Sequence, residues 1–350
     1  MLLLFSGSRS WEIVTIQYSL TCLSATRQLG VIPLLGVAAA LTLLATFLVG
    51  RGAPHPEPAM AVTLLAFAGF LALMLLFAAA GVPDRLASLA GPAAGWLLGV
   101  ALLFLYVLYG AGSRTFSFSR LAAVAAFLFL PLSLLAAAGD KPPGSWHDFL
   151  TLAFVWAAVK FGPTHWLWPY PGGRLAYIFT VVAAVDLALA GFVLLRRTKD
   201  VGYQIAWASH WTVHIVGPLL LFALIAVPLG IHIHFIAYEP RFQEWKAFVP
   251  LSVGILFFTA WPEELLFRGL LQNLASRAAA SETLGWIVAS VLFGFSHITN
   301  LGFPNWRYVL LASIAGLSYG WTWRKTGSIF ASALVHASVD ILWHFLFRTV

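Results

Sequence analysis

Long runs of apolar residues set the strongest limit on the fold of this chain. A helix needs roughly 20 mostly apolar residues to cross a bilayer, and about ten runs of suitable length follow one another from residue 30 onward. Only 9% of the 350 residues are charged, whereas a soluble domain has about 25%. A soluble core cannot absorb so much apolar surface. We therefore predict an all-α, polytopic transmembrane helix bundle with about nine to eleven spans.

Two stretches do not fit this pattern of spans. Residues 149–170 are rich in aromatic residues but are broken by "KFGPTHWLWPYPGG". Because Trp and Tyr gather at membrane interfaces, we predict an interfacial or re-entrant piece there. Residues 1–29 are apolar but interrupted, and are predicted to form an interfacial or poorly ordered segment. The predicted spans are 30–50, 59–83, 93–112, 121–139, 175–195, 205–229, 247–276, 284–299, 306–323 and 328–347.

Ionisable residues are distributed unevenly between the two parts of the chain. The spans within residues 30–200 are rich in Ala and Leu, and Asp186 is an isolated acid there, expected either to line a cavity or to bond a neighbouring helix. Residues 201–350 hold most of the His, Glu and Asp residues at membrane depth. Such residues usually mark functional sites in membrane proteins. We therefore predict transmembrane helices of unassigned role at 30–200 and a functional core at 201–350.

Charge and cysteine content exclude several classes of function. The net charge of +7 is typical of the Lys/Arg excess in loops of a multispanning protein, so we expect membrane lipid and no nucleic acid as a partner. Cys22 is the single cysteine, which excludes an intrachain disulfide framework and a cysteine-based zinc site.

Loop charges also predict which loops share a side of the membrane. The positive-inside rule assigns one set of basic loops to the cytoplasm and leaves loops of mixed sign outside. If residues 149–170 also crossed the membrane, every loop before them would change sides relative to the C-terminal half. The mixed loops are Asp140–Lys141 and Glu239–Lys246. The basic set is Arg114, Arg120, Arg196, Arg197, Lys199, Arg277, Arg324 and Lys325.

The stretch "AWPEELLFRGLLQ" at 260–272 places charges inside a predicted span. Glu264 and Arg268 are four residues apart, so they share one helix face and form an ion pair in the favourable order. Pairing removes much of the cost of burying either charge. Glu263 has no basic residue at either helical spacing. An unpaired carboxyl in an apolar setting suits a general acid or base.

Two more polar pairs follow on later spans. "FGFSH" places Phe293 one turn before His297, and "HASVD" places His336 one turn before Asp340. Counted from the span ends near Arg277 and Arg324, Glu263 and His297 lie about 13 residues deep and His336 about 8. At 1.5 Å per residue, these depths are roughly 20 and 12 Å. We expect the three side chains to meet in one cavity that opens toward the cytoplasm.

Structural roles compete with this interpretation. A buried Glu264–Arg268 pair can simply lock two helices, and a lone membrane histidine often makes only an interhelical hydrogen bond. His210 and His214 have the spacing of two metal ligands, but no carboxylate lies near them in sequence, so packing is favoured. His344 lies two turns beyond His336 and is expected near the far interface.

The three ordered motifs "EELLFR" (263–268), "FGFSH" (293–297) and "HASVD" (336–340) resemble those of the CPBP family. This family contains intramembrane proteases of the CAAX-protease and bacteriocin-processing (Abi) type. The resemblance covers roughly residues 205–347. It implies an intramembrane endopeptidase core at 201–350, a substrate that is a membrane-embedded or prenylated (CAAX-type) peptide, and an integral protein of a bacterial-type plasma (inner) membrane.

The resemblance also implies roles for individual residues. Glu263 matches the glutamate that activates a water, and Glu264 and Arg268 match a supporting pair. His297 and His336 match the motif histidines, with His336 the expected donor to the oxyanion. Asp340 departs from the best-known CAAX-cleaving members, which have Asn there. An ionised Asp cannot donate a hydrogen bond, so its role is left open between a protonated donor, a partner of His336 and a metal ligand.

Three alternatives remain beside a metal-free glutamate protease. Glu263, His297 and His336 together match the ligand set of a catalytic zinc site. A non-proteolytic immunity or scaffold protein could keep the same motifs. A small transporter could use the same carboxylates and histidines as a proton relay, although the sequence lacks the repeated halves expected of one.

Overall fold

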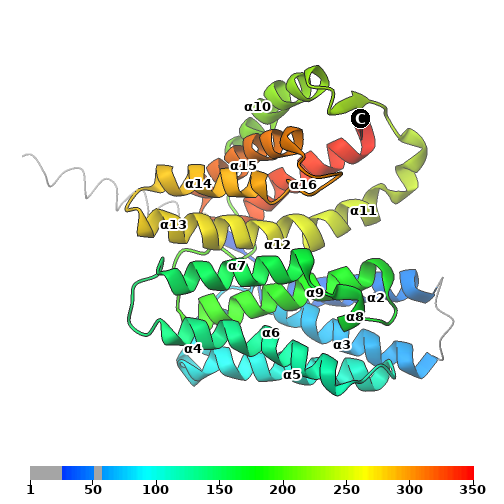
Figure 1. The fold of residues 1–350 in the computed structure, drawn as a ribbon, viewed down its shortest axis with the longest axis vertical. Coiled ribbons are helices and arrows are strands. Elements are labelled where there is room, and N and C mark those ends of the chain that lie inside the picture. The colour runs from blue at the N-terminus through cyan, green and yellow to red at the C-terminus, as the bar shows by residue number, and fades with distance from the viewer. Residues whose placement is uncertain (1–25, 51–56) are drawn as a thin grey trace, which may run out of the picture.

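The computed structural model describes residues 26–50 and 57–350. The chain forms two stacked groups of helices, one from each half of the sequence, and a long helix of the second group runs along the boundary between them (Figure 1). The helices of the N-terminal half are α2 (Val31–Gly50), α3 (Glu57–Leu76), α4 (Val82–Ala90), α5 (Ala93–Gly112), α6 (Phe118–Ala137), α7 (Trp146–Phe161), α8 (Thr164–Leu167) and α9 (Gly173–Ala188), which continues as the π-helix η1 (Leu189–Leu195).

The C-terminal half begins at α10 and contains one helix that changes its winding along its length. Residues 242–278 run without interruption through the helical segments η2 to α13. The elements of this half are α10 (Trp211–His232), η2 (Phe242–Ala247), α11 (Phe248–Ile255), η3 (Leu256–Ala260), α12 (Trp261–Glu264), η4 (Leu265–Gln272), α13 (Asn273–Ala278), α14 (Glu282–Phe295), α15 (Trp306–Thr326) and α16 (Ile329–Leu346).

The predicted all-α membrane bundle is confirmed. Among the described residues, six helices are long and apolar enough to cross a membrane, and shorter apolar helices accompany them. Most predicted spans match helices within a few residues, and 93–112 coincides with α5. The predicted span 59–83 is too long, because the chain turns after α3 ends at Leu76. The described residues thus form an integral membrane protein made of helices.

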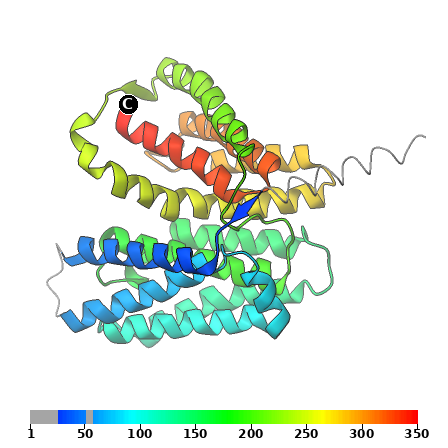
Figure 2. The same cartoon turned by 180° about the vertical axis from the view of Figure 1, so that it is seen from behind.

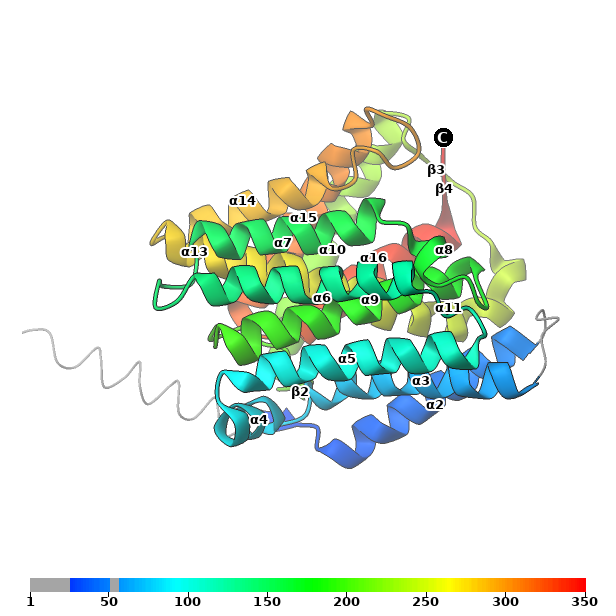
Figure 3. The same cartoon turned by 60° about the horizontal axis from the view of Figure 1, so that its bottom comes forward.

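The prediction for residues 149–170 is wrong over its first half. Residues 146–161 form the continuous helix α7, which lies beside α6 and α9 and contacts η4 of the other half (Figure 3). The helix starts in a capping box, in which Ser145 and Asp148 satisfy each other's backbone groups. The break signalled by Gly162 and Pro163 comes only after α7. This stretch therefore supplies a full helix of the bundle.

Because α7 is an additional helix, the prediction of which side of the membrane several loops occupy is also wrong. Arg196 donates hydrogen bonds to the carbonyl oxygens of Gly139, Lys141 and Pro142, so the mixed-charge loop shares an end of the bundle with a basic loop. Arg120 donates to the carbonyl oxygen of Trp166, beyond the far end of α7. The 16 residues of α7 separate these two places by roughly 24 Å. Basic residues therefore lie at both ends of the bundle, and charge does not distinguish them.

One pair of short strands links the two halves, and a second pair fixes the segment that follows α16. Strand β1 (Arg27–Gln28) pairs antiparallel with β2 (Ala206–Trp207) at the junction between the halves, which Figure 2 shows from behind. Strand β3 (Ile236–Tyr238) pairs with β4 (Phe347–Thr349) after α16. The end of the predicted segment 1–29 is thus ordered by strand pairing, while residues 1–25 lie outside the described residues.

Small residues let α14 and α15 approach closely in the C-terminal half. A Cβ atom at Gly294 would lie 2.5 Å from the carbonyl oxygen of Val309, and one at Gly316 would lie 3.0 Å from Cα of Ser290. Close approach through small residues is the usual way in which helices pack in membranes. This contact fixes α14, and with it the position of the turn that carries His297.

Candidate active site

The site is built on the long helix at the boundary between the two halves. Glu263 and Glu264 end the short α-helical segment α12, and π-helical turns lie on both sides of it, in η3 and η4. Such π-turns widen a helix and occur frequently at functional sites. Adjacent residues on this helix point in different directions, so the two carboxylates meet different surroundings.

Glu264 is fully buried, and both of its carboxylate oxygens accept hydrogen bonds. Its Oε2 accepts a hydrogen bond from the Ser332 hydroxyl at 2.5 Å, and its Oε1 accepts one from Nδ1 of His336 at 2.9 Å. The predicted ion pair is present, with Nε of Arg268 3.2 Å from Oε2. Both donors come from α16, so Glu264 joins the long helix to that helix.

Arg268 is fully buried, and its nitrogens form no hydrogen bond within the described residues. Its contact with Glu264 is therefore electrostatic. Aromatic rings complete its surroundings: the guanidinium carbon lies 4.9 Å from the ring centre of Phe293, 5.6 Å from that of Tyr319 and 5.9 Å from that of Phe267. Cation–π attraction is strong when the cation is desolvated. We call Arg268 and these rings the arginine box.

His336 is held in one orientation from both sides of its ring. The ring stacks on Tyr319, with the centres 4.5 Å apart, and it meets the edge of Phe293 at 5.5 Å. Because a carboxylate only accepts hydrogen bonds, the bond to Glu264 places a proton on Nδ1. Nε2 then lies 3.9 Å from Oε2 of Glu263 and 3.6 Å from Oδ2 of Asp340.

The acceptor that orients His336 is thus Glu264, whereas the motif spacing pointed to Asp340 for this role. Asp340, one turn away on α16, lies beyond hydrogen-bond distance. Its side chain is 32% exposed. Glu264 fixes the ring instead, while Asp340 faces the same space as Nε2.

His297 follows α14, whose last helical residue is Phe295, and does not lie on the helix as the predicted span 284–299 implies. Its Nδ1 donates to the carbonyl oxygen of Phe293 at 2.8 Å, and the two rings lie 4.8 Å apart. The bond leaves Nε2 without a protein partner in the described part of the chain. Phe293 therefore contacts His297, His336 and Arg268, and links the three motifs.

Glu263 and His297 line one cavity of about 650 Å³. The Glu263 side chain is 29% exposed and accepts no hydrogen bond within the described residues. The cavity extends to the end of α7 and to α8, at the end of the bundle opposite Arg277. The expected opening beside the Arg277 and Arg324 loops is therefore wrong, and loop charge does not mark this opening as cytoplasmic. Its wall includes Trp156, Lys160, Tyr177, Phe258, Leu266, Phe267 and Asn300.

Several of these neighbours were missed from sequence. Ser332 precedes His336 by one helical turn, so the spacing of "SALVHASVD" could have revealed it. Lys160 and Asn300 carried no such signal, because only the fold brings α7 beside the turn after α14. The other polar candidates lie elsewhere: His344 lies 3.3 Å from Glu244 near the end of α16, and Asp186 is fully buried in the N-terminal half.

A catalytic zinc ion needs three protein ligands that converge on one point. Among the described residues, no three His, Cys, Asp or Glu side chains converge as a metal ion requires. The three residues suggested for zinc thus do not form a ligand cluster in this arrangement.

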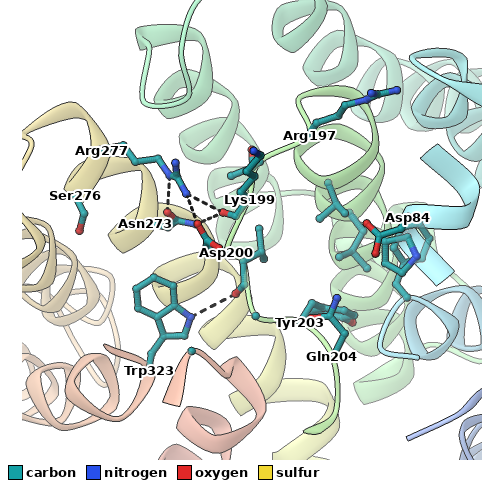
Figure 4. Close-up of a pocket in the computed structure, with 18 of the residues that line it drawn as sticks. Asp84, Arg197, Lys199, Asp200, Tyr203, Gln204, Asn273, Ser276, Arg277 and Trp323 are labelled. Carbon is teal, nitrogen blue, oxygen red and sulfur yellow. Dashed lines mark hydrogen bonds and ion pairs between the residues drawn. The ribbon is translucent and has the colours of Figure 1, made fainter. Parts of the chain in front are cut away.

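A larger cavity of about 1360 Å³ lies at the opposite end of the bundle, between the two halves (Figure 4). Arg277 pairs there with Asp200 at 2.8 Å and also donates to Asn273. Glu263 and the motif histidines do not line it. Size alone therefore does not identify the site, which is placed by its chemistry.

Residues 245–342 match the family model described as type II CAAX prenyl endopeptidase Rce1-like. This part of the chain is similar to that family. The match contains all three motifs and confirms the resemblance to the CPBP proteases. The Rce1-like family supports a CAAX-type intramembrane endopeptidase, which is a peptide hydrolase. Helices α2 to α10 lie outside the match. No curated protein and no solved structure matches the chain.

Proposed function

We propose that the chain hydrolyses peptide bonds of membrane-embedded or lipidated substrates with a water activated by Glu263. One observation carries this proposal. Of two adjacent carboxylates, Glu264 is fully buried and accepts hydrogen bonds from α16. Glu263 is 29% exposed, accepts no hydrogen bond within the described residues, and lines the cavity that also contains His297. An unbonded carboxylate in a sheltered cavity can take a proton from water.

The proposed reaction starts when Glu263 takes a proton from a water in the cavity. The water oxygen attacks the peptide carbonyl, and the carbonyl electrons form an oxyanion. His336 carries protons on both nitrogens, so it donates through Nδ1 to Glu264 and through Nε2 to the oxyanion. The proton on Glu263 then passes to the leaving nitrogen, and the C–N bond breaks. Free Nε2 of His297 helps to hold the attacking water.

The surroundings of His336 support its role as the oxyanion donor. The ring is almost fully buried and clamped between Tyr319, Phe293 and Glu264, so its Nε2 direction is fixed before substrate arrives. A preorganised donor in a site that excludes water stabilises developing charge more than a mobile one does. Asp340 lies beside this position, and we propose that it orients His336 weakly or binds the substrate.

The test uses purified full-length protein and a panel of transmembrane and prenylated peptides, with products followed by mass spectrometry. We expect cleavage by the wild type, and a loss of at least about 100-fold in Glu263→Gln, because general-base catalysis contributes that much. Glu282→Gln makes the same substitution on an exposed first-turn residue and should keep activity. Each reaction is repeated with a chelator, because a zinc-dependent protease would lose activity there.

Retained cleavage in Glu263→Gln would reject the assigned base. Loss of cleavage with chelator, restored by zinc, would reject the metal-free mechanism. If no peptide is cleaved by any variant and the cellular phenotype also survives Glu263→Gln, the non-proteolytic scaffold role would be supported instead.

A further inference from the structure

The cavity that contains Glu263 is not formed by the family-matched residues alone. One wall consists of the end of α7, helix α8 and the start of α9, all of which belong to the N-terminal half. This wall supplies Lys160, Trp156 and Tyr177. The helices outside the family match thus contribute directly to the surface that a substrate would touch.

Lys160 is a cation on this wall that forms no salt bridge, and its anionic neighbour is the cavity residue Glu263, with which it interacts electrostatically at longer range. Its ammonium donates to the amide oxygen of Asn300 at 2.5 Å. Within the described ranges, no carboxylate lies close enough to form an ion pair with it. An ammonium has three donor hydrogens, so two are left after the bond to Asn300. An ammonium near membrane helices is costly unless it has a partner or a function.

The rest of the cavity is mainly apolar and aromatic. Phe258, Leu266 and Phe267 come from the long helix, and Trp156 and Tyr177 face them from the N-terminal half. Such a surface suits apolar side chains, with few polar groups to fix their orientation. A peptide segment bound here would place apolar residues on these walls, and an anionic group on it would find Lys160.

We propose that Lys160 is a specificity-determining residue that binds a carboxylate of the substrate, with Asn300 holding the ammonium in place. The proposal rests on the proposed peptidase function and adds a substrate property to it. A peptide can offer this carboxylate from its C-terminus or from an Asp or Glu side chain near the cleaved bond. Charge-assisted hydrogen bonds are the strongest of those available to an ammonium.

The experiment compares wild type, Lys160→Met and Lys160→Arg on matched peptides. One peptide has a free C-terminus, a second is its C-terminal amide, and a third is the amide with an Asp near the cleaved bond. The wild type should prefer a carboxylate-bearing peptide by at least about tenfold in kcat/KM, as expected for a hydrogen bond to a charged group. Lys160→Met should lose this preference through a higher KM, and Lys160→Arg should keep most of it.

Two further measurements separate the possible failures. Lys141→Met removes an exposed lysine at the other end of the bundle and should keep the preference. Binding of the same peptides to Glu263→Gln, with and without Lys160→Met, measures recognition without catalysis. A Lys160-dependent preference in binding would support the proposal even if no peptide is cleaved, which would reject only the proposed peptidase.

The proposal would be overturned by a wild type that does not distinguish the acid from either amide in cleavage or binding. It would also be overturned if Lys160→Met lowers kcat equally for all three peptides, because Lys160 would then act on Glu263 and not on the substrate. The peptide that carries the preference identifies the source of the carboxylate, either the C-terminus or the side chain.

Discussion

Each half of the molecule buries an arginine–carboxylate pair, and the two pairs are built differently. In the N-terminal half, Arg196 binds Asp148 through two hydrogen bonds of 2.8 and 2.9 Å, and its remaining donors reach backbone carbonyls. In the C-terminal half, Arg268 lies 3.2 Å from Glu264 without a hydrogen bond and is surrounded by aromatic rings.

The carboxylates differ in the same way. Asp148 accepts its other hydrogen bonds from Ser145 and the backbone of Gly144, all close in sequence, so this pair closes a loop at the end of the bundle. The two oxygens of Glu264 accept hydrogen bonds from Ser332 and His336, which lie on another helix. A fully bonded pair fixes the backbone, whereas the arginine box supplies charge to Glu264 and leaves that carboxylate free to orient an imidazole.

The largest effect is expected from Arg268→Met. This change breaks a buried ion pair and leaves Glu264 with His336 as its remaining cationic neighbour, and breaking such a pair typically costs about 3–5 kcal/mol. We expect a much lower melting temperature in detergent and loss of peptide cleavage, because Glu264 without Arg268 no longer holds His336 in one orientation. A variant that melts like wild type would show that the arginine box does not carry the stability assigned to it.

Arg196→Met makes the same change in the other pair and should separate stability from activity. Asp148 keeps its donors from Ser145 and Gly144, so the loss should be smaller, roughly 1.5–3 kcal/mol for hydrogen bonds to a charged group. The protein that remains folded should cleave peptides with unchanged kcat/KM. Melting curves and rates corrected for folded fraction measure both, and a specific loss of kcat would contradict the contrast between the pairs.

Ser332→Ala removes one hydrogen bond to Glu264 and leaves its contacts with His336 and Arg268 in place. We expect roughly 1–2 kcal/mol of destabilisation, because the carboxylate keeps His336 and Arg268. Cleavage should fall in kcat with little change in KM, since the orientation of His336 is affected and not the cavity wall. Ser338→Ala, on the same helix with a hydroxyl bonded to the Leu334 carbonyl, is the matched control.

The smallest effect is expected from Asp340→Asn. Asp340 lies 3.6 Å from Nε2 of His336, too far for a strong hydrogen bond, so we expect less than about a tenfold change in kcat/KM (about 1.4 kcal/mol). Rates on one peptide before and after the substitution measure this directly. A loss comparable to that of Glu263→Gln would place Asp340 in the reaction itself.

Sequence reasoning predicted the parts of the fold that depend on local pattern. Apolar runs of about 20 residues located most helices, and the four-residue spacing of Glu264 and Arg268 predicted their ion pair. Helix α7 was missed because Gly162 and Pro163 break the apolar run at its end, and this break hid the regular helix before it. The loops before α7 were then assigned to the wrong ends relative to the C-terminal half.

The parts of the site that depend on residue spacing within one helix were predictable from the sequence. Motif spacing identified Glu263, His297 and His336 as candidates, and the fold places Glu263 near His336 and in one cavity with His297. The bond between Glu264 and His336 joins residues 72 apart in sequence, and that between Lys160 and Asn300 joins residues 140 apart. No local pattern reports contacts of this range, so these partners emerge only from packing.

The most direct test of this account compares Glu263→Gln with Glu264→Gln, the same change at adjacent positions, by melting temperature and peptide cleavage. We predict that Glu263→Gln melts like wild type and loses cleavage, because it removes only the base. Glu264→Gln should lose both stability and cleavage, because it removes the counter-charge of Arg268 and leaves one acceptor oxygen where Ser332 and His336 use two. Wild-type cleavage by Glu263→Gln would contradict the account.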